Sequence, residues 1–175
     1  MPDNSRPVPA TPRLTLLMAA ASAIAFELAQ SDGAFRPLVL TVSLSVQAVI
    51  TTATVLVCRH RRNREAVVSP ALLWGFVSVA VVWFVGEVFL RERLGAGWPV
   101  EFWFLGLLRN AVLCLAALGV WSKYARISTM LSLFLAIFVS ALPGYWLTHV
   151  LIIGYAVVGI WWLMGNYWEA LQGHL

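Results

Sequence analysis

The feature that most constrains this chain is a long uncharged stretch near its C-terminus. From Ile127 to Trp168, 42 residues, only His149 can carry a charge near neutral pH. A single α-helix of that length would measure roughly 60 Å, about twice the thickness of the hydrocarbon core of a bilayer. The stretch therefore has to fold back on itself, and the Pro-Gly pair within residues 141–144 is the expected place. Two antiparallel membrane helices follow from this stretch alone.

Composition excludes an ordinary soluble domain. Hydrophobic residues make up 61% of the 175 residues and charged residues 11%, whereas about 25% of the residues in a soluble domain are charged. The mean hydropathy of +0.82 leaves room for one helical bundle and little else. In such a chain, a net charge of +4 reflects membrane topology rather than nucleic-acid binding.

The hydropathy pattern predicts an all-α fold: a polytopic helical membrane protein, a bundle of about six transmembrane helices with short loops. We expect one transmembrane domain over residues 14–168, between a flexible tail at residues 1–13 and a short tail at residues 169–175. The predicted spans are residues 14–30, 37–58, 67–90, 102–121, 127–142 and 145–168. Whether the natural protein continues beyond Leu175 stays open.

Basic residues predict the orientation, because short cytoplasmic loops retain positive charge. With residues 59–64 inside, eight of the twelve lysines and arginines are cytoplasmic: Arg6, Arg13, Arg59, Arg61, Arg62, Arg64, Lys123 and Arg126. Arg36, Arg91 and Arg93 are left outside, and Arg109 lies within a span. Both termini are then cytoplasmic, and we expect the protein in the cell (inner) membrane.

The first apolar segment has two interpretations. Arg6 and Arg13 precede an apolar run that ends in Ala23-Ile24-Ala25, an order typical of secretory signal peptides cleaved after a small residue. The alternative is a retained helix over residues 14–30. We expect the retained helix, because the alanine-rich residues 19–23 dilute the hydrophobic region that export would need.

Arg109 is the clearest candidate for a specific role inside the membrane. A charge in the bilayer core costs about 2.5–3.5 kcal/mol on insertion scales, so it needs a compensating group. Arg109 lies seven residues into its predicted span, roughly 10 Å below the outer surface, and is followed by Asn110. Glu27 and Glu87 lie close to the outer ends of their spans, and His149 lies just inside the last span. All of these groups therefore fall in the outer half.

This candidate polar cluster of Arg109, Glu87, Glu27, His149 and Asn110 has two interpretations. In the first, it is a pocket that opens outward and binds an anion or passes protons, with Arg109 as its floor. In the second, which we favour, Arg109 pairs with Glu87 between adjacent helices, while Glu27 and His149 reach the membrane surface by snorkelling.

Other polar and small residues within the spans are expected to serve helix packing. Gln47 and Asn166 are isolated amides, and such residues often form hydrogen bonds between helices. Small residues in the first and last spans allow close backbone approach, within the monomer or between copies: Ala19, Ala21, Ala23, Ala25, Gly154, Ala156 and Gly159.

The basic segment at residues 59–64 also has two interpretations. Its arginines either fix the topology, which we favour, or bind anionic lipid headgroups as well: Arg59, Arg61, Arg62 and Arg64. We expect no nucleic-acid partner, because the segment is short and has no interleaved aromatic residues or accompanying domain.

No motif in the sequence specifies a reaction, a cofactor or a metal. The His-Glu-x-x-His motif of metalloproteases and the Gly-x-Ser-Gly turn of rhomboid-type serine proteases are absent. His60 and His149 are predicted at opposite sides of the membrane, so they cannot bracket one haem. Cys58 and Cys114 have neither zinc-site nor Cys-x-x-Cys spacing. We therefore expect no catalytic residue, cofactor or metal, and we favour a non-enzyme, although the sequence leaves enzymatic activity open.

Two classes of function agree with these features. The first is a non-catalytic multi-pass membrane protein that acts as an anchor, scaffold or assembly subunit of a membrane complex. Its expected partners are the lipid bilayer and another membrane protein or further copies of itself. The alternative is a small transporter or channel with an outward-facing polar site around Arg109. The sequence leaves the substrate, the partner and the oligomeric state open.

Overall fold

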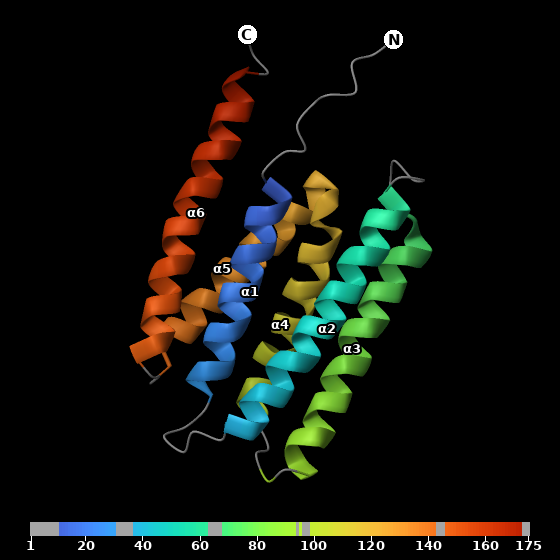
Figure 1. The fold of residues 1–175 in the computed structure, drawn as a ribbon, viewed down its shortest axis with the longest axis vertical. Helices are drawn as coiled ribbons and strands as arrows, with labels where there is room; N and C mark the ends of the chain where they lie inside the picture. The colour runs from blue at the N-terminus through green and yellow to red at the C-terminus, as the bar shows by residue number, and fades with distance from the viewer. Residues whose placement is uncertain are drawn as a thin grey trace.

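The structure, a computed structural model, is all-helical and describes residues 11–30, 37–62, 68–93, 95, 99–142 and 146–172. Its six α-helices are α1 (Thr11–Ala29), α2 (Pro37–Arg62), α3 (Pro70–Arg93), α4 (Val100–Ala117), α5 (Ser122–Ser140) and α6 (Trp146–Gln172). A short 3₁₀ helix, η1 (Leu118–Val120), continues α4. Figure 1 shows the helices packed as one bundle. The prediction of an all-α fold is confirmed.

Five of the helices, α2 to α6, are long and apolar enough to cross a membrane. The uncharged stretch is interrupted where the sequence predicts, because α5 ends at Ser140 and α6 begins at Trp146. Residues 143–145, where the sequence predicts part of the turn, lie outside the described residues, as do residues 1–10, Arg36, Arg64 and residues 173–175.

Several helices extend beyond the predicted spans. α1 begins at Thr11, α5 begins at Ser122 and α6 continues to Gln172, so part of each predicted tail or loop is helical. α2 continues to Arg62, which places three of the predicted loop arginines on its last turn. Apolar residues mark only the part of a helix that lies in an apolar environment. The helix itself can extend farther, because polar residues also form its backbone hydrogen bonds. Basic side chains are also favourable at a helix C-terminus.

Helix α1 lies at the centre of the bundle. It packs most extensively on α6 and α5, and also on α4, and Figure 1 shows it between α6 and α2. The predicted small residues make this possible, since Ala19, Ala23 and Ala25 are all buried against neighbouring helices. In α6, Gly159 approaches α1 closely, and a Cβ there would lie 3.3 Å from the Met18 side chain. Small side chains thus allow α1 to be enclosed.

The remaining helices lie on two sides of α1, with α2, α3 and α4 on one side and α5 and α6 on the other. α3 packs on α4, and α2 packs on α4 and η1. On the other side, α5 and α6 are joined by a hydrogen bond of 3.0 Å between the hydroxyls of Ser132 and Tyr155, both buried. Figure 1 shows α2 and α3 beside each other at the edge of the bundle farthest from α6.

Candidate functional site

Charged side chains from three helices meet inside the bundle. Glu27 comes from α1, Glu87 and Arg91 from α3, and Arg109 from α4. Their exposed fractions are 2%, 7%, 6% and 0%, respectively. Three buried polar side chains adjoin them, and we call the seven residues the ion-pair cluster: Glu27, Ser43, Gln47, Glu87, Arg91, Arg109 and Asn110. Two carboxylates and two guanidinium groups give it a formal charge of zero.

The alternating direction of the helices brings these residues to one end of the bundle. The C-terminal ends of α1 and α3 lie beside the N-terminal halves of α2 and α4 (Figure 1). Within two helices, spacing completes the arrangement: Ser43 and Gln47 are four residues apart, as are Glu87 and Arg91. Residues at that spacing share one face of an α-helix.

Arg109 is the centre of the cluster. Its guanidinium forms ion pairs with Glu27 and with Glu87. Its Nε and Nη2 atoms also donate to the Asn110 Oδ1 atom, at 3.0 and 2.8 Å. The rings of Phe26 and Trp83 each lie 5.7 Å from its Cζ atom, a distance at which a cation is attracted to an aromatic face. Arg109 is thus neutralised and fully enclosed.

Arg91 contacts the same two carboxylates from the other side. It pairs with Glu27, and its Nη2 and Nε atoms lie 3.1 and 3.2 Å from the Glu87 Oε1 atom. Each glutamate therefore contacts both arginines, and each arginine contacts both glutamates. Since a buried charge is tolerated when it is paired and hydrogen-bonded, this reciprocal arrangement stabilises four charges together.

Helix α2 closes the cluster with neutral groups. The Ser43 hydroxyl donates to Glu87 at 3.0 Å, and the Gln47 amide donates to Glu27 at 2.9 Å. The predicted hydrogen bond between helices at Gln47 is therefore present. Among the described residues, the Nδ2 atom of Asn110 has no acceptor, although Asn110 is fully buried.

The structure contains part of the predicted polar cluster and contradicts another part. The structure brings Glu27, Glu87, Arg109 and Asn110 together, and the Arg109–Glu87 pair is present. Snorkelling of Glu27 is wrong, because the side chain is buried against both arginines. Arg91, predicted on the outer side of the membrane and not in the cluster, is a further member of it, because α3 continues past the apolar segment and buries this side chain against both glutamates. The spacing of four residues from Glu87 is the signal that could have found Arg91.

The structure does not bring His149 to the cluster. His149 is exposed on α6, a helix that packs mainly on α1 and α5. The other predicted polar residues also lie elsewhere. Arg59, Arg61 and Arg62 are exposed at the end of α2, and the side chain of Asn166 lies outside what the structure describes.

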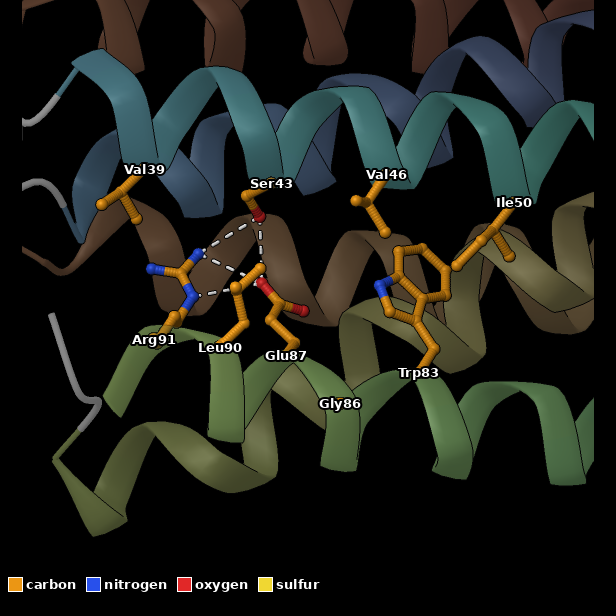
Figure 2. Close-up of a pocket in the computed structure, with 9 residues that line it drawn as sticks. All are labelled: Val39, Ser43, Val46, Ile50, Trp83, Gly86, Glu87, Leu90 and Arg91. Carbon is orange, nitrogen blue, oxygen red and sulfur yellow. Dashed lines mark hydrogen bonds and ion pairs between the residues drawn. The ribbon is translucent and has the colours of Figure 1, made fainter. Parts of the chain in front are cut away.

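A cavity of about 230 Å³ lies between α2 and α3, beside the cluster. Figure 2 shows the side chains of Ser43, Glu87 and Arg91 meeting between the two helices, where they form the polar part of the cavity wall. The remaining wall is apolar and includes Val46 and Trp83. The cavity is thus mostly apolar, and one face of the ion-pair cluster borders it.

The described residues hold no group of three or more histidines, cysteines or acidic residues placed to bind a metal ion. Cys58 and Cys114 are free thiols, buried in one apolar core between α2, α3 and α4. They contribute to packing rather than to a polar site.

Comparisons with protein-family models, with curated proteins and with solved structures found no match to this chain. The ion-pair cluster and the adjoining cavity are therefore the features from which a function can be inferred.

Proposed function

We propose that this chain is a non-catalytic multi-pass protein of the cell (inner) membrane that acts as an anchor, scaffold or assembly subunit of a membrane complex. The observation that carries this proposal is the closure of the ion-pair cluster. Its four charged side chains neutralise one another, and Arg109 is fully buried between Glu27 and Glu87. A catalytic centre needs a reactive group that faces a substrate, whereas these groups face one another.

Membrane insertion of all six helices is part of the proposal. α2 to α6 are apolar enough to cross, and α1, with 19 residues, spans about 28 Å, close to the thickness of a bilayer core. Its buried position supports a retained helix, because one face of the segment, with Met18, Ala19 and Ala23, packs against other helices. Its charge at Glu27 is compensated within the bundle, so the helix exposes no acidic group to lipid at that point.

We infer that both termini face the cytoplasm. The exposed Arg59, Arg61 and Arg62 end α2, and the exposed Lys123 and Arg126 begin α5. Because α2 and α4 run in the same direction (Figure 1), these groups share one end of the bundle. Positive charge gathered at one end supports a cytoplasmic location for that end.

Helix α6 offers the surface for a partner. It packs only against one side of the bundle, and large apolar side chains cover its outer face: Ile153, Val157, Ile160, Trp161, Met164 and Trp168. Gly154 is exposed on the same helix, and a Cβ there would meet no atom within 4 Å. An exposed glycine in an apolar helix permits close approach of a helix from another membrane protein or from a second copy.

Purification of a tagged copy from its native membrane in a mild detergent, followed by mass analysis of the intact assembly, tests the scaffold role. We expect a stoichiometric second membrane protein, or defined copies of this chain. We also expect Gly154→Leu to release the partner, whereas Gly75→Leu, at an exposed glycine of α3, should retain it. A monomer that carries no partner would reject the proposal.

The alternative, a small transporter or channel with its site around Arg109, is favoured by one observation. The cavity between α2 and α3 reaches Glu87 and Arg91, so one face of the cluster is accessible from outside the bundle core. The test is flux of protons and small anions in proteoliposomes. Transport predicts that Arg109→Lys, which keeps the charge but loses the planar geometry, reduces flux while the protein still folds. No flux, or equal flux in this variant, would reject a site at Arg109.

A further inference from the structure

The cavity between α2 and α3 has the composition of a binding site for an amphiphile. Its apolar part is formed by Val46, Ile50 and Trp83, and its polar part by side chains of the ion-pair cluster (Figure 2). Binding sites for small molecules commonly combine a mostly apolar wall with a few polar groups that fix orientation. Here both kinds of wall are present within one space of about 230 Å³.

The cavity exists because small residues leave room between α2 and α3. Gly86 lies on its wall, and a Cβ there would meet nothing within 4 Å. Two wall residues are also partly exposed at the surface of the bundle: Val46 by 38% and Leu90 by 40%. The cavity is therefore reached from the side of the bundle, between two helices that are apolar enough to lie in a membrane. Lateral access suits a molecule that is itself dissolved in the bilayer.

The polar wall presents both donors and acceptors. Ser43 carries a hydroxyl, Glu87 a carboxylate oxygen and Arg91 a guanidinium, and hydrogen bonds of 3.0 to 3.3 Å already join these groups. A ligand hydroxyl both donates and accepts, so it can extend this network without breaking it. A purely apolar molecule would leave the polar wall unused.

Charge balance decides against an ionised ligand. The cluster already contains two carboxylates and two guanidinium groups in reciprocal pairs. A phosphate, carboxylate or ammonium headgroup would add an uncompensated charge to a buried site, which is strongly unfavourable. The volume is also smaller than the range of about 300–1,000 Å³ typical of sites for drug-sized molecules. This favours one hydrocarbon chain over the two chains of a phospholipid.

We propose that the cavity between α2 and α3 binds an uncharged amphiphile with one hydrocarbon chain and a hydroxyl headgroup, such as a long-chain alcohol or a monoacylglycerol. The hydroxyl meets Ser43 and Glu87, the part of the chain next to it lies along Val46, Ile50 and Trp83, and the rest of the chain extends between α2 and α3 into the bilayer. This site rests on membrane insertion of α2 and α3, but not on the scaffold role.

The experiment is photolabelling of the protein in nanodiscs with a hexadecanol that carries a diazirine in its chain, followed by mass spectrometry of the labelled peptides. We expect labelling within residues 39–50 and 83–91. Gly86→Leu fills the cavity and should reduce labelling there by about tenfold or more. A tenfold loss of affinity is what the exclusion of about two methylene groups of the ligand from the cavity would cause. Gly75→Leu is the matched control: Gly75 is three helical turns before Gly86, is equally open and does not line the cavity.

Competition identifies the headgroup. Unlabelled hexadecanol and a monoacylglycerol should displace the probe, whereas hexadecane and hexadecyl phosphate should displace it at least about tenfold less well. Equal labelling of Gly86→Leu and Gly75→Leu would overturn the site, and equal competition by the phosphate would overturn the choice of an uncharged headgroup. If Gly86→Leu does not fold, Val46→Trp fills the cavity from α2 at a partly exposed position and is read in the same way.

These outcomes are independent of those for the scaffold role. Loss of labelling in Gly86→Leu with the assembly intact supports the ligand site whatever the partner is. Retained labelling with an intact assembly overturns the ligand site alone.

Discussion

Replacement of Arg109 is the most direct test of the ion-pair cluster. Arg109→Met keeps most of the side-chain length but removes the positive charge and its donors. Glu27 and Glu87 then share Arg91 alone, and the buried site changes from a formal charge of zero to minus one. Removal of one partner from a buried ion pair costs about 3–5 kcal/mol, because it leaves an uncompensated charge. We expect a loss of unfolding free energy in this range.

A second substitution separates charge balance from packing. Glu87→Gln alone leaves a formal charge of plus one and should also destabilise the protein. In the double variant the charge returns to zero, since Glu27 and Arg91 still form an ion pair. The double variant should therefore lose less stability than the sum of the single losses, by about 1–3 kcal/mol, as measured for residues in one charged network.

The assay is equilibrium unfolding in mixed micelles, in which sodium dodecyl sulfate is titrated into a mild detergent. Arg93→Met is the control, because Arg93 lies on the same helix as Arg91 but is exposed. It should leave the unfolding free energy nearly unchanged. Additive losses for Arg109→Met and Glu87→Gln would refute the idea that the cluster is held by charge balance.

Three further predictions concern packing and topology. Ala19→Leu should destabilise the bundle by about 1–3 kcal/mol in the same assay, because Ala19 is fully buried where α1 meets its neighbours, whereas Ala48→Leu, at an exposed position of α2, should not. Tyr155→Phe should lower the unfolding free energy by about 0.6–1.7 kcal/mol, the range for hydrogen bonds between membrane helices, because it removes the hydrogen bond to Ser132 of α5. An unchanged unfolding midpoint would show that this hydrogen bond does not stabilise the bundle. In a background without the native cysteines, a membrane-impermeant maleimide should label Arg93→Cys but not Arg61→Cys in intact cells, and the reverse pattern would contradict the proposed orientation.

The sequence predicts the helices well because hydropathy reports directly on which segments require an apolar environment. It predicts the helix ends less well. The apolar segments stop at Cys58 and Leu90, but the helices continue to Arg62 and Arg93, since backbone hydrogen bonds do not depend on side-chain polarity. Likewise, α5 begins at Ser122 although its first turn carries Lys123.

The ion-pair cluster could be predicted only in part. Arg109 stands out because it is a charge within an apolar segment, and Glu87 is a carboxylate near the outer end of the preceding predicted span. The hydropathy pattern places Arg91 after the apolar segment, and it does not reveal that the long side chain pairs with Glu27 and Glu87 inside the bundle. Ser43 gives almost no signal, because a hydroxyl in an apolar helix is common and only the position of α3 makes it a partner of Glu87. Relative helix placement is the information that the sequence pattern lacks.

The cluster also bears on which helices can move. Separation of α4 from α1 and α3 would break the ion pairs of Arg109 with Glu27 and Glu87, and separation of α1 would break those of Glu27 with both arginines. Each such motion exposes charges in a poorly solvating environment, so α1, α3 and α4 are expected to behave as one rigid unit. By contrast, α6 is held by apolar contacts with α1 and by the hydroxyl contact between Tyr155 and α5. A mechanism in which α1, α3 and α4 rock against one another is therefore disfavoured, whereas adjustment of α6 to a partner breaks none of the ion pairs of the cluster. This asymmetry supports assembly through α6 more than transport through the ion-pair cluster.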